Sequence, residues 1–82
     1  SAEQGNRDGQ YMTSIAAYYG EGGLKKSQLN SFMWLELSAR GGHLKGIEAR
    51  NGYGMTFKFS DLVKAINLAE ACEASHYKNC GE

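Results

Sequence analysis

The chain has 82 residues, of which 41% are hydrophobic and 22% are charged, a composition typical of one soluble globular domain. Nine basic residues balance nine acidic ones, and no Lys or Arg cluster of the kind that binds nucleic acid or an anionic membrane is present. No apolar run approaches the roughly 20 residues of a transmembrane helix, so we predict no membrane insertion.

The first ten residues are polar and do not resemble a signal peptide. We predict a disordered leader over residues 1–8 and a single domain over residues 9–82. The chain has eleven glycines and no proline. Several glycines are grouped, which indicates turns between helices and not a flexible linker.

The first predicted helix covers residues 9–19. Tyr11, Ile15 and Tyr18 or Tyr19 recur at spacings of three and four, as on one face of an amphipathic helix. The run Gly-Glu-Gly-Gly at 20–23 ends it. A second helix follows after a short connection, so we expect an αα-hairpin.

The second predicted helix runs from Ser27, whose hydroxyl can cap it, to about Arg40. Gly41 or Gly42 can supply the left-handed residue that ends it. Large apolar side chains occupy most of its circumference, so we expect other elements to pack on several sides of it. Trp34 is predicted to be a core residue, with a binding platform as the alternative.

Residues 43–50 start another helix-like segment, but residues 51–59 are ambiguous. Asn51-Gly52 is a strong signal for a two-residue hairpin. The following Tyr53, Met55, Phe57 and Phe59 alternate with smaller or polar residues, as in a half-buried strand. Two fold classes therefore stay open: an all-α fold, and an α+β fold with a hairpin at 46–59.

A final helix is predicted from Ser60, which can cap it, followed by Asp61 at the positive end of the helix dipole. One face of this helix is apolar and includes Leu62, Ala65, Ile66, Ala69 and Cys72.

The run Ser-Phe-Met-Trp-Leu-Glu-Leu-Ser-Ala-Arg-Gly-Gly-His at 31–43 resembles the second helix of a Sel1-like repeat. Tyr-Tyr-Gly-Glu-Gly at 18–22 resembles the end of the family's first helix. Residues 47–51, then Met55-Thr56 and the alanine-rich segment 65–70, resemble the last helices of such arrays. The resemblance covers about residues 10–75.

The resemblance implies an all-α fold of the α/α superhelix type, related to the tetratricopeptide repeats, with about two helical hairpins. It also implies an interaction module for a protein or peptide, without a cofactor. Because two repeats are few for a self-supporting array, we expect a homodimer, a part of a longer array, or stabilisation by a disulfide.

Cys72 and Cys80 have three interpretations. They form a disulfide, they are inert thiols, or they bind a metal together with His76 and, as a conceivable fourth ligand, His43. We favour the disulfide and predict no metal. The pair also resembles the disulfide clamp of the family's cysteine-rich secreted bacterial branch, which implies a periplasmic or secreted protein.

His43 follows a helix stop and is either a ligand or catalytic base, or a cap of the preceding carbonyl groups, which we favour. No motif places a Ser, Cys or carboxylate partner beside it, so we predict no catalytic residues and no enzyme.

Four tyrosines are the candidate partner-binding residues: Tyr11, Tyr18, Tyr19 and Tyr53. In α/α solenoids the first helix of each pair lines the concave surface, so these rings are placed on a groove or are ordinary packing residues. The leading hypothesis is a non-enzymatic interaction module. The alternative is a small secreted α+β toxin, inhibitor or immunity-type protein.

Overall fold

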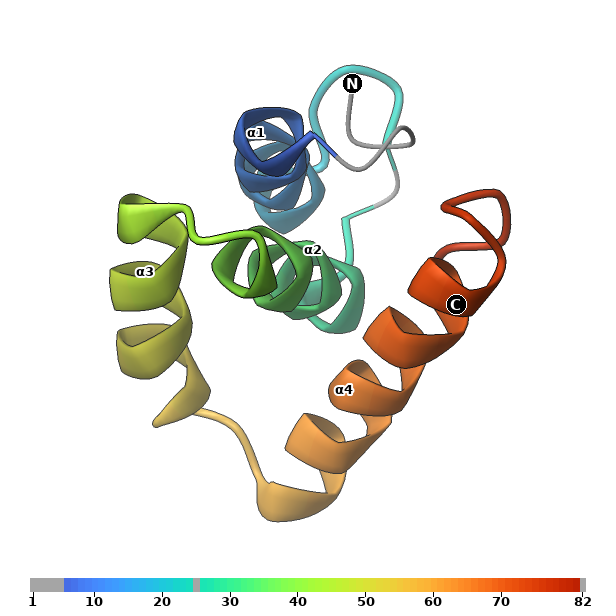
Figure 1. Ribbon diagram of the computed structural model, residues 1–82. Helices are drawn as coiled ribbons and strands as arrows, with labels where there is room; N and C mark the ends of the chain where they lie inside the picture. The colour runs from blue at the N-terminus through green and yellow to red at the C-terminus, as the bar shows by residue number, and fades with distance from the viewer. Residues whose placement is uncertain (1–5, 25, 82) are drawn as a thin grey trace.

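The computed structural model describes residues 6–24 and 26–81 and contains, in this part of the chain, four helices and no strand (Figure 1). They are α1 (Arg7–Tyr19), α2 (Gln28–Arg40), α3 (Leu44–Gly54) and α4 (Phe59–Ala74). The all-α prediction is therefore confirmed.

The alternative α+β fold is wrong, because residues 46–54 belong to α3 and a turn follows at 55–57. The alternation that suggested a strand contains two pairs at the helical spacing of four. Tyr53 and Phe57 face inward and their rings touch, with centroids 4.8 Å apart. Met55 and Phe59 point to solvent, with 87% and 80% of their surface exposed. Every second position also contains pairs spaced by four, so alternation over so short a run fits both a strand and a helical turn.

Helix α2 lies at the centre of the fold, with α1, α3 and α4 around it (Figure 1). Every residue from 31 to 39 is buried, which confirms that other elements pack on several sides of this helix. The predicted αα-hairpin of α1 and α2 is present. Helices α3 and α4 each pack on α2 and diverge from the turn that joins them, so the second hairpin is open (Figure 1).

Helix ends follow local capping rules, with two differences from expectation. Asn6 caps α1 by accepting a hydrogen bond from the Gly9 N–H, so the helix begins two residues before the predicted position and includes part of the predicted leader. The rest of that leader, residues 1–5, lies outside the described residues. Ser27 caps α2 as predicted. Ser60 does not cap α4, because the helix already begins at Phe59.

The main core lies between α2 and α4. Met33, Trp34 and Leu37 pack against Ala69 and Cys72, and all five are buried. The apolar face predicted for α4 is confirmed by its three buried residues, which include Ala65. Trp34 is only 9% exposed, which favours the core interpretation over a binding platform.

Cys72 and Cys80 form a disulfide, which confirms the favoured interpretation. It joins the end of α4 to the C-terminal segment, and Tyr77 in the closed loop packs on the core. The metal-site alternative is wrong, because both sulfurs are used in the disulfide and cannot act as thiolate ligands.

Candidate functional site

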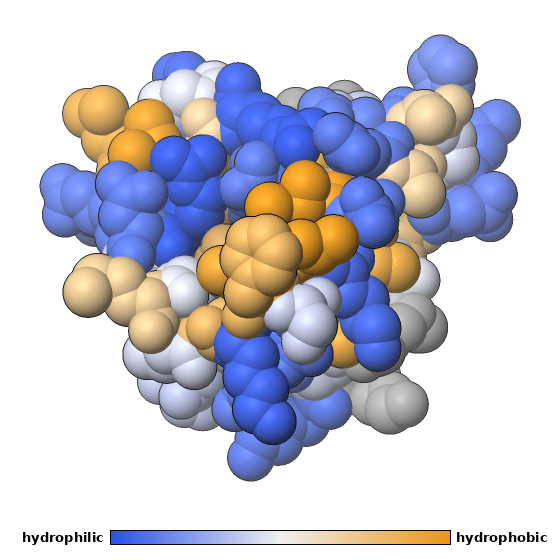
Figure 2. Space-filling view, turned by 90° about the horizontal axis from the view of Figure 1, so that it is seen from below, coloured by the Kyte–Doolittle hydropathy of each residue, from blue (hydrophilic) through white to orange (hydrophobic). Residues whose placement is uncertain are grey.

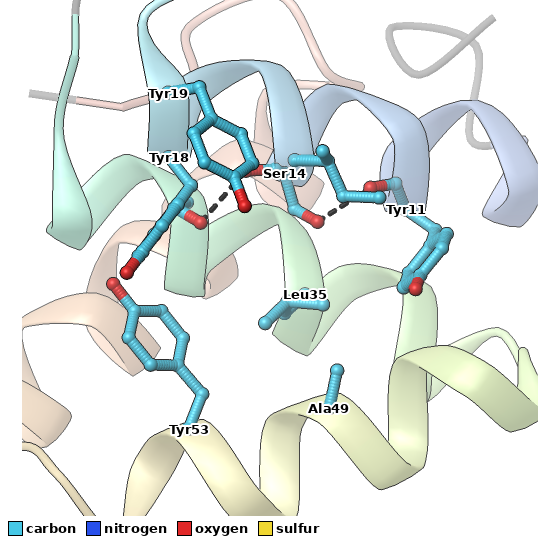
Figure 3. Close-up of a pocket in the computed structure, with 9 residues that line it drawn as sticks. Tyr11, Ser14, Tyr18, Tyr19, Leu35, Ala49 and Tyr53 are labelled. Atoms are coloured by element: carbon cyan, nitrogen blue, oxygen red, sulfur yellow. Dashed lines mark hydrogen bonds between the residues drawn. The ribbon is translucent and has the colours of Figure 1, made fainter.

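A groove of about 330 Å³ lies over α2, between α1 and α3 (Figure 3). We call it the tyrosine groove, because all four of the tyrosines predicted from the sequence line it. Tyr11, Tyr18 and Tyr19 come from α1, and Tyr53 comes from α3. Its other lining residues are small or aliphatic: Ser14, Ile15, Ser31, Leu35 and Ala49.

Small residues at the contact between α1 and α2 shape the floor of the groove. The buried Ser31 hydroxyl on α2 donates a hydrogen bond to the Ser14 carbonyl oxygen of α1 over 2.8 Å. The Ser14 hydroxyl donates to the Tyr11 carbonyl oxygen of its own helix. Both hydroxyl groups are therefore satisfied inside the protein, so the floor keeps no donor from them for a ligand.

One end of the groove lies at the last turns of α1 and α3, and aromatic rings make up its wall. The Tyr18 ring meets the Tyr53 ring edge to face, with centroids 5.6 Å apart and planes at 79°. Tyr19 meets Tyr18 in the same manner at 4.9 Å and 85°. On the inner side, Tyr53 also contacts Phe57 and Phe32. Edge-to-face contacts of this kind hold the rings in defined orientations.

The four tyrosines differ in exposure. Tyr18 and Tyr19 are 40% and 63% exposed. Tyr11 and Tyr53 are half-buried and serve the packing as well. Together they give the groove an apolar wall with hydroxyl groups at its edge.

The Tyr53 hydroxyl is buried and has no hydrogen-bond partner in the described part of the chain. Figure 3 shows the Tyr18 and Tyr53 side chains pointing their hydroxyl ends toward one another. Burial raises the pKa of Tyr53 above its usual value, and the neighbouring Tyr18 raises it further. The hydroxyl therefore keeps its proton at neutral pH and is a donor without an acceptor.

His43 borders the other end of the groove, where its ring stacks on Tyr11 with centroids 4.7 Å apart. Its Nδ1 accepts a hydrogen bond from the Gly46 N–H, so it caps the start of α3. The prediction that it caps the preceding carbonyl groups is wrong, because its extended backbone is that of an N-cap residue. Its Nε2 lies 3.1 Å from Asp8 Oδ1. Because Nδ1 accepts, the ring proton is on Nε2, facing this carboxylate.

Charged side chains gather beside His43. Arg7, Asp8 and Lys45 line a second hollow that adjoins it. The Arg7 Nη1 donates to the Gly41 carbonyl oxygen over 3.1 Å, which ties the start of α1 to the end of α2. Sequence reasoning missed Asp8 because it placed this residue in the leader. The signal for it was its distance of three residues from Tyr11, which puts both on one face once the helix is extended.

The described residues contain no group of three or more His, Cys, Asp or Glu side chains placed to hold a metal ion. Among the same residues, none of the helices has the length and apolar character needed to cross a membrane.

Comparison of the chain with protein-family models, with curated proteins and with solved structures found no match. The Sel1-like resemblance therefore stays a hypothesis supported by the quoted residues.

Proposed function

We propose that this chain is a non-enzymatic interaction module of the Sel1-like type, and that it binds a protein or peptide in the tyrosine groove. The observation that carries the proposal is the convergence of four tyrosines from two separate helices on one hollow. Tyrosine offers large apolar contact area, a polar tip and few rotatable bonds, and it is enriched in protein interfaces for these reasons.

The size of the groove sets the kind of complex. A hollow of about 330 Å³ is at the lower end of the range for ligand pockets, roughly 300–1,000 Å³. It holds a few side chains of a partner and not a whole folded surface. We therefore propose a short segment as the ligand, with the affinity of a transient complex.

The chemistry at His43 supports a non-enzymatic role. The imidazole uses Nδ1 as the acceptor of a helix cap and directs Nε2 to Asp8. A ring with both nitrogens engaged in this way is a structural group and not a free base.

The test is capture of a partner from a native extract, with matched variants. The double variant Tyr18→Ala Tyr19→Ala removes the two exposed rings of the groove. Met12→Ala removes a side chain of α1 that is 63% exposed and does not line the groove, and serves as the control. We expect the tyrosine variant to lose the partner and the control to keep it. Equal capture by both variants would show that the tyrosine groove does not bind the partner.

We also propose a surface for assembly. It lies at the turn between α3 and α4 and would contact a second copy of the chain or a further repeat. Figure 2 shows this side, with apolar side chains gathered among charged ones. Met55, Phe59 and Val63 are exposed by 87%, 80% and 40%. Stacked neighbours cover such end faces in repeat proteins. Light scattering on the protein and on Met55→Asp tests this: a monomer in both cases would contradict self-association.

The disulfide supports a periplasmic or secreted location, since such bonds persist in oxidising compartments.

A further inference from the structure

His43 joins the starts of α1 and α3 through both nitrogens of its ring. Its Nδ1 accepts a hydrogen bond from the Gly46 N–H over 3.0 Å, and its Nε2 lies 3.1 Å from Asp8 Oδ1. The ring also stacks on Tyr11, and its side chain is only 15% exposed. A neutral imidazole fits these contacts because it has one acceptor nitrogen and one N–H donor.

The Gly46 N–H belongs to a buried contact between α3 and α2. Gly46 is buried, and a Cβ at this position would overlap the Ser38 hydroxyl of α2. That hydroxyl donates its own hydrogen bond to the Leu35 carbonyl oxygen. A buried N–H that loses its acceptor destabilises the structure around it. The first turn of α3 therefore depends on the acceptor that His43 provides.

A second proton on the His43 ring removes this acceptor. Histidine side chains change charge between about pH 5 and pH 8, and the charged ring has two N–H donors and no acceptor. Because Nε2 carries the first proton, the second one binds Nδ1 and points at the Gly46 N–H. Two donors then face one another, and the cap of α3 is lost.

The charged groups around the ring draw it toward α1 and away from α3. Those that line the adjoining hollow in the described part of the chain are Arg7 and Asp8 on α1 and Lys45 on α3. Asp8 attracts a charged ring, whereas Lys45 and the positive end of the α3 dipole repel it. Arg7 repels it too, but its guanidinium is held by the Gly41 carbonyl oxygen. A charged His43 thus keeps a partner on α1 and has none on α3.

We propose that His43 is a pH-sensitive cap of α3. The neutral ring holds the first turn of this helix against α1 and α2. In acid, the charged ring stays with Asp8 and releases the Gly46 N–H, and the first turn of α3 moves away from α2 until this N–H reaches water. Because α3 also carries Ala49 and Tyr53, the cap links pH to one wall of the tyrosine groove. The cap acts on the structure of the chain and does not depend on a ligand in the groove.

The experiment is amide hydrogen exchange of the whole chain at about pH 8 and about pH 5, the limits between which histidine changes charge. The readout is the protection factor of Gly46 and of Ile47, whose N–H donates to the His43 carbonyl oxygen in the first turn of α3. We expect both factors to fall about five- to tenfold at the lower pH, the effect of one lost helix cap. In an NMR titration, the Gly46 amide signal should shift in step with the His43 ring signals.

Two asparagine variants separate the two histidines of the chain. His43→Asn supplies an acceptor that caps a helix and does not titrate, so its protection factors should be the same at both pH values. His76→Asn replaces the other histidine, at a left-handed position that asparagine tolerates, and should behave like the wild type.

Three results would overturn the proposal. They are unchanged protection of Gly46 and Ile47 in the wild type, an equal fall in His43→Asn, and a Gly46 signal that does not follow the His43 ring. The equal fall would assign the effect to carboxylate groups. The titration of the wild type decides the question even if His43→Asn does not fold.

Discussion

The two sides of α2 are built from different kinds of residue. On the α4 side, long side chains such as Met33 and Leu37 fill the space up to Ala69 and Cys72, and a disulfide holds the end of the layer. On the α1 side, small residues make the contact, and the Ser31 hydroxyl donates to the Ser14 carbonyl oxygen. Side chains fill the space between α2 and α4. On the α1 side the tyrosine rings are only partly covered, and the groove lies on that side for this reason.

The largest expected effect on stability comes from the core between α2 and α4. Met33 is fully buried, so Met33→Ala should lower the free energy of unfolding by about 2–5 kcal/mol, from lost burial and the cavity left behind. Ile15→Ala on the groove side should cost less, because Ile15 is only half-buried. Denaturant unfolding measures both. Equal losses would show that the two sides do not differ.

Reduction of the disulfide tests the same side by a second route. Opening the short loop between Cys72 and Cys80 should lower the free energy of unfolding by about 2–3 kcal/mol, mainly through the unfolded chain. The measurement is the melting temperature with and without a reductant. Cys72→Ala Cys80→Ala is the control, whose melting temperature should not respond. If the reductant also leaves the melting temperature of the wild type unchanged, the disulfide does not stabilise the fold.

Alanine substitutions at two glycines of α3 compare the stability effects at its inner and outer faces. A Cβ on Gly46 would overlap the Ser38 hydroxyl of α2, so Gly46→Ala should destabilise by about 1–3 kcal/mol. A Cβ on Gly52 meets nothing, so Gly52→Ala should stabilise by up to about 1 kcal/mol through helix propensity. Thermal unfolding of the two variants checks the signs. A stabilising Gly46→Ala would contradict the close packing of α3 on α2.

The smallest expected effect on stability concerns Tyr53. Tyr53→Phe removes a buried hydroxyl without a partner, so stability should stay equal or rise by about 1 kcal/mol. Because the pKa of Tyr53 is raised in the folded protein, the unfolded chain loses this proton first as the pH rises above about 10. The wild type should therefore lose stability above that pH, and Tyr53→Phe should lose less. Parallel pH profiles of unfolding would contradict a raised pKa.

Local signals in the sequence were sufficient for much of this fold. The Ser27 cap and the Gly41-Gly42 stop predicted α2 closely, because such signals act within one turn of the helix. The sequence did not decide between helix and strand for residues 51–59, because alternation over a few residues fits a strand and a helical turn equally well. The predicted role of His43 was also wrong. Its hydrogen bond with the Gly46 N–H is a local N-cap contact, whereas its contact with Asp8 depends on where α1 meets the start of α3, which no local pattern states.

The candidate site was predictable in its rings and not in its floor. Tyr11, Tyr18 and Tyr19 could be identified from their type and their place on the first predicted helix, whereas Tyr53 could be identified from its type alone. Leu35 and Ala49 could not, because they join the groove only where three helices meet. Likewise, the missing partner of the Tyr53 hydroxyl is a property of the packed structure.

Binding in the tyrosine groove is tested most directly by chemical-shift mapping of the ¹⁵N-labelled protein during titration with the partner segment captured from the extract. We expect the shifts to concentrate on groove residues of α1 and α3, such as Ile15, Tyr18 and Tyr53, and α4 to stay unchanged. Shifts centred on α4, or none at a saturating concentration of the segment, would contradict binding in the groove.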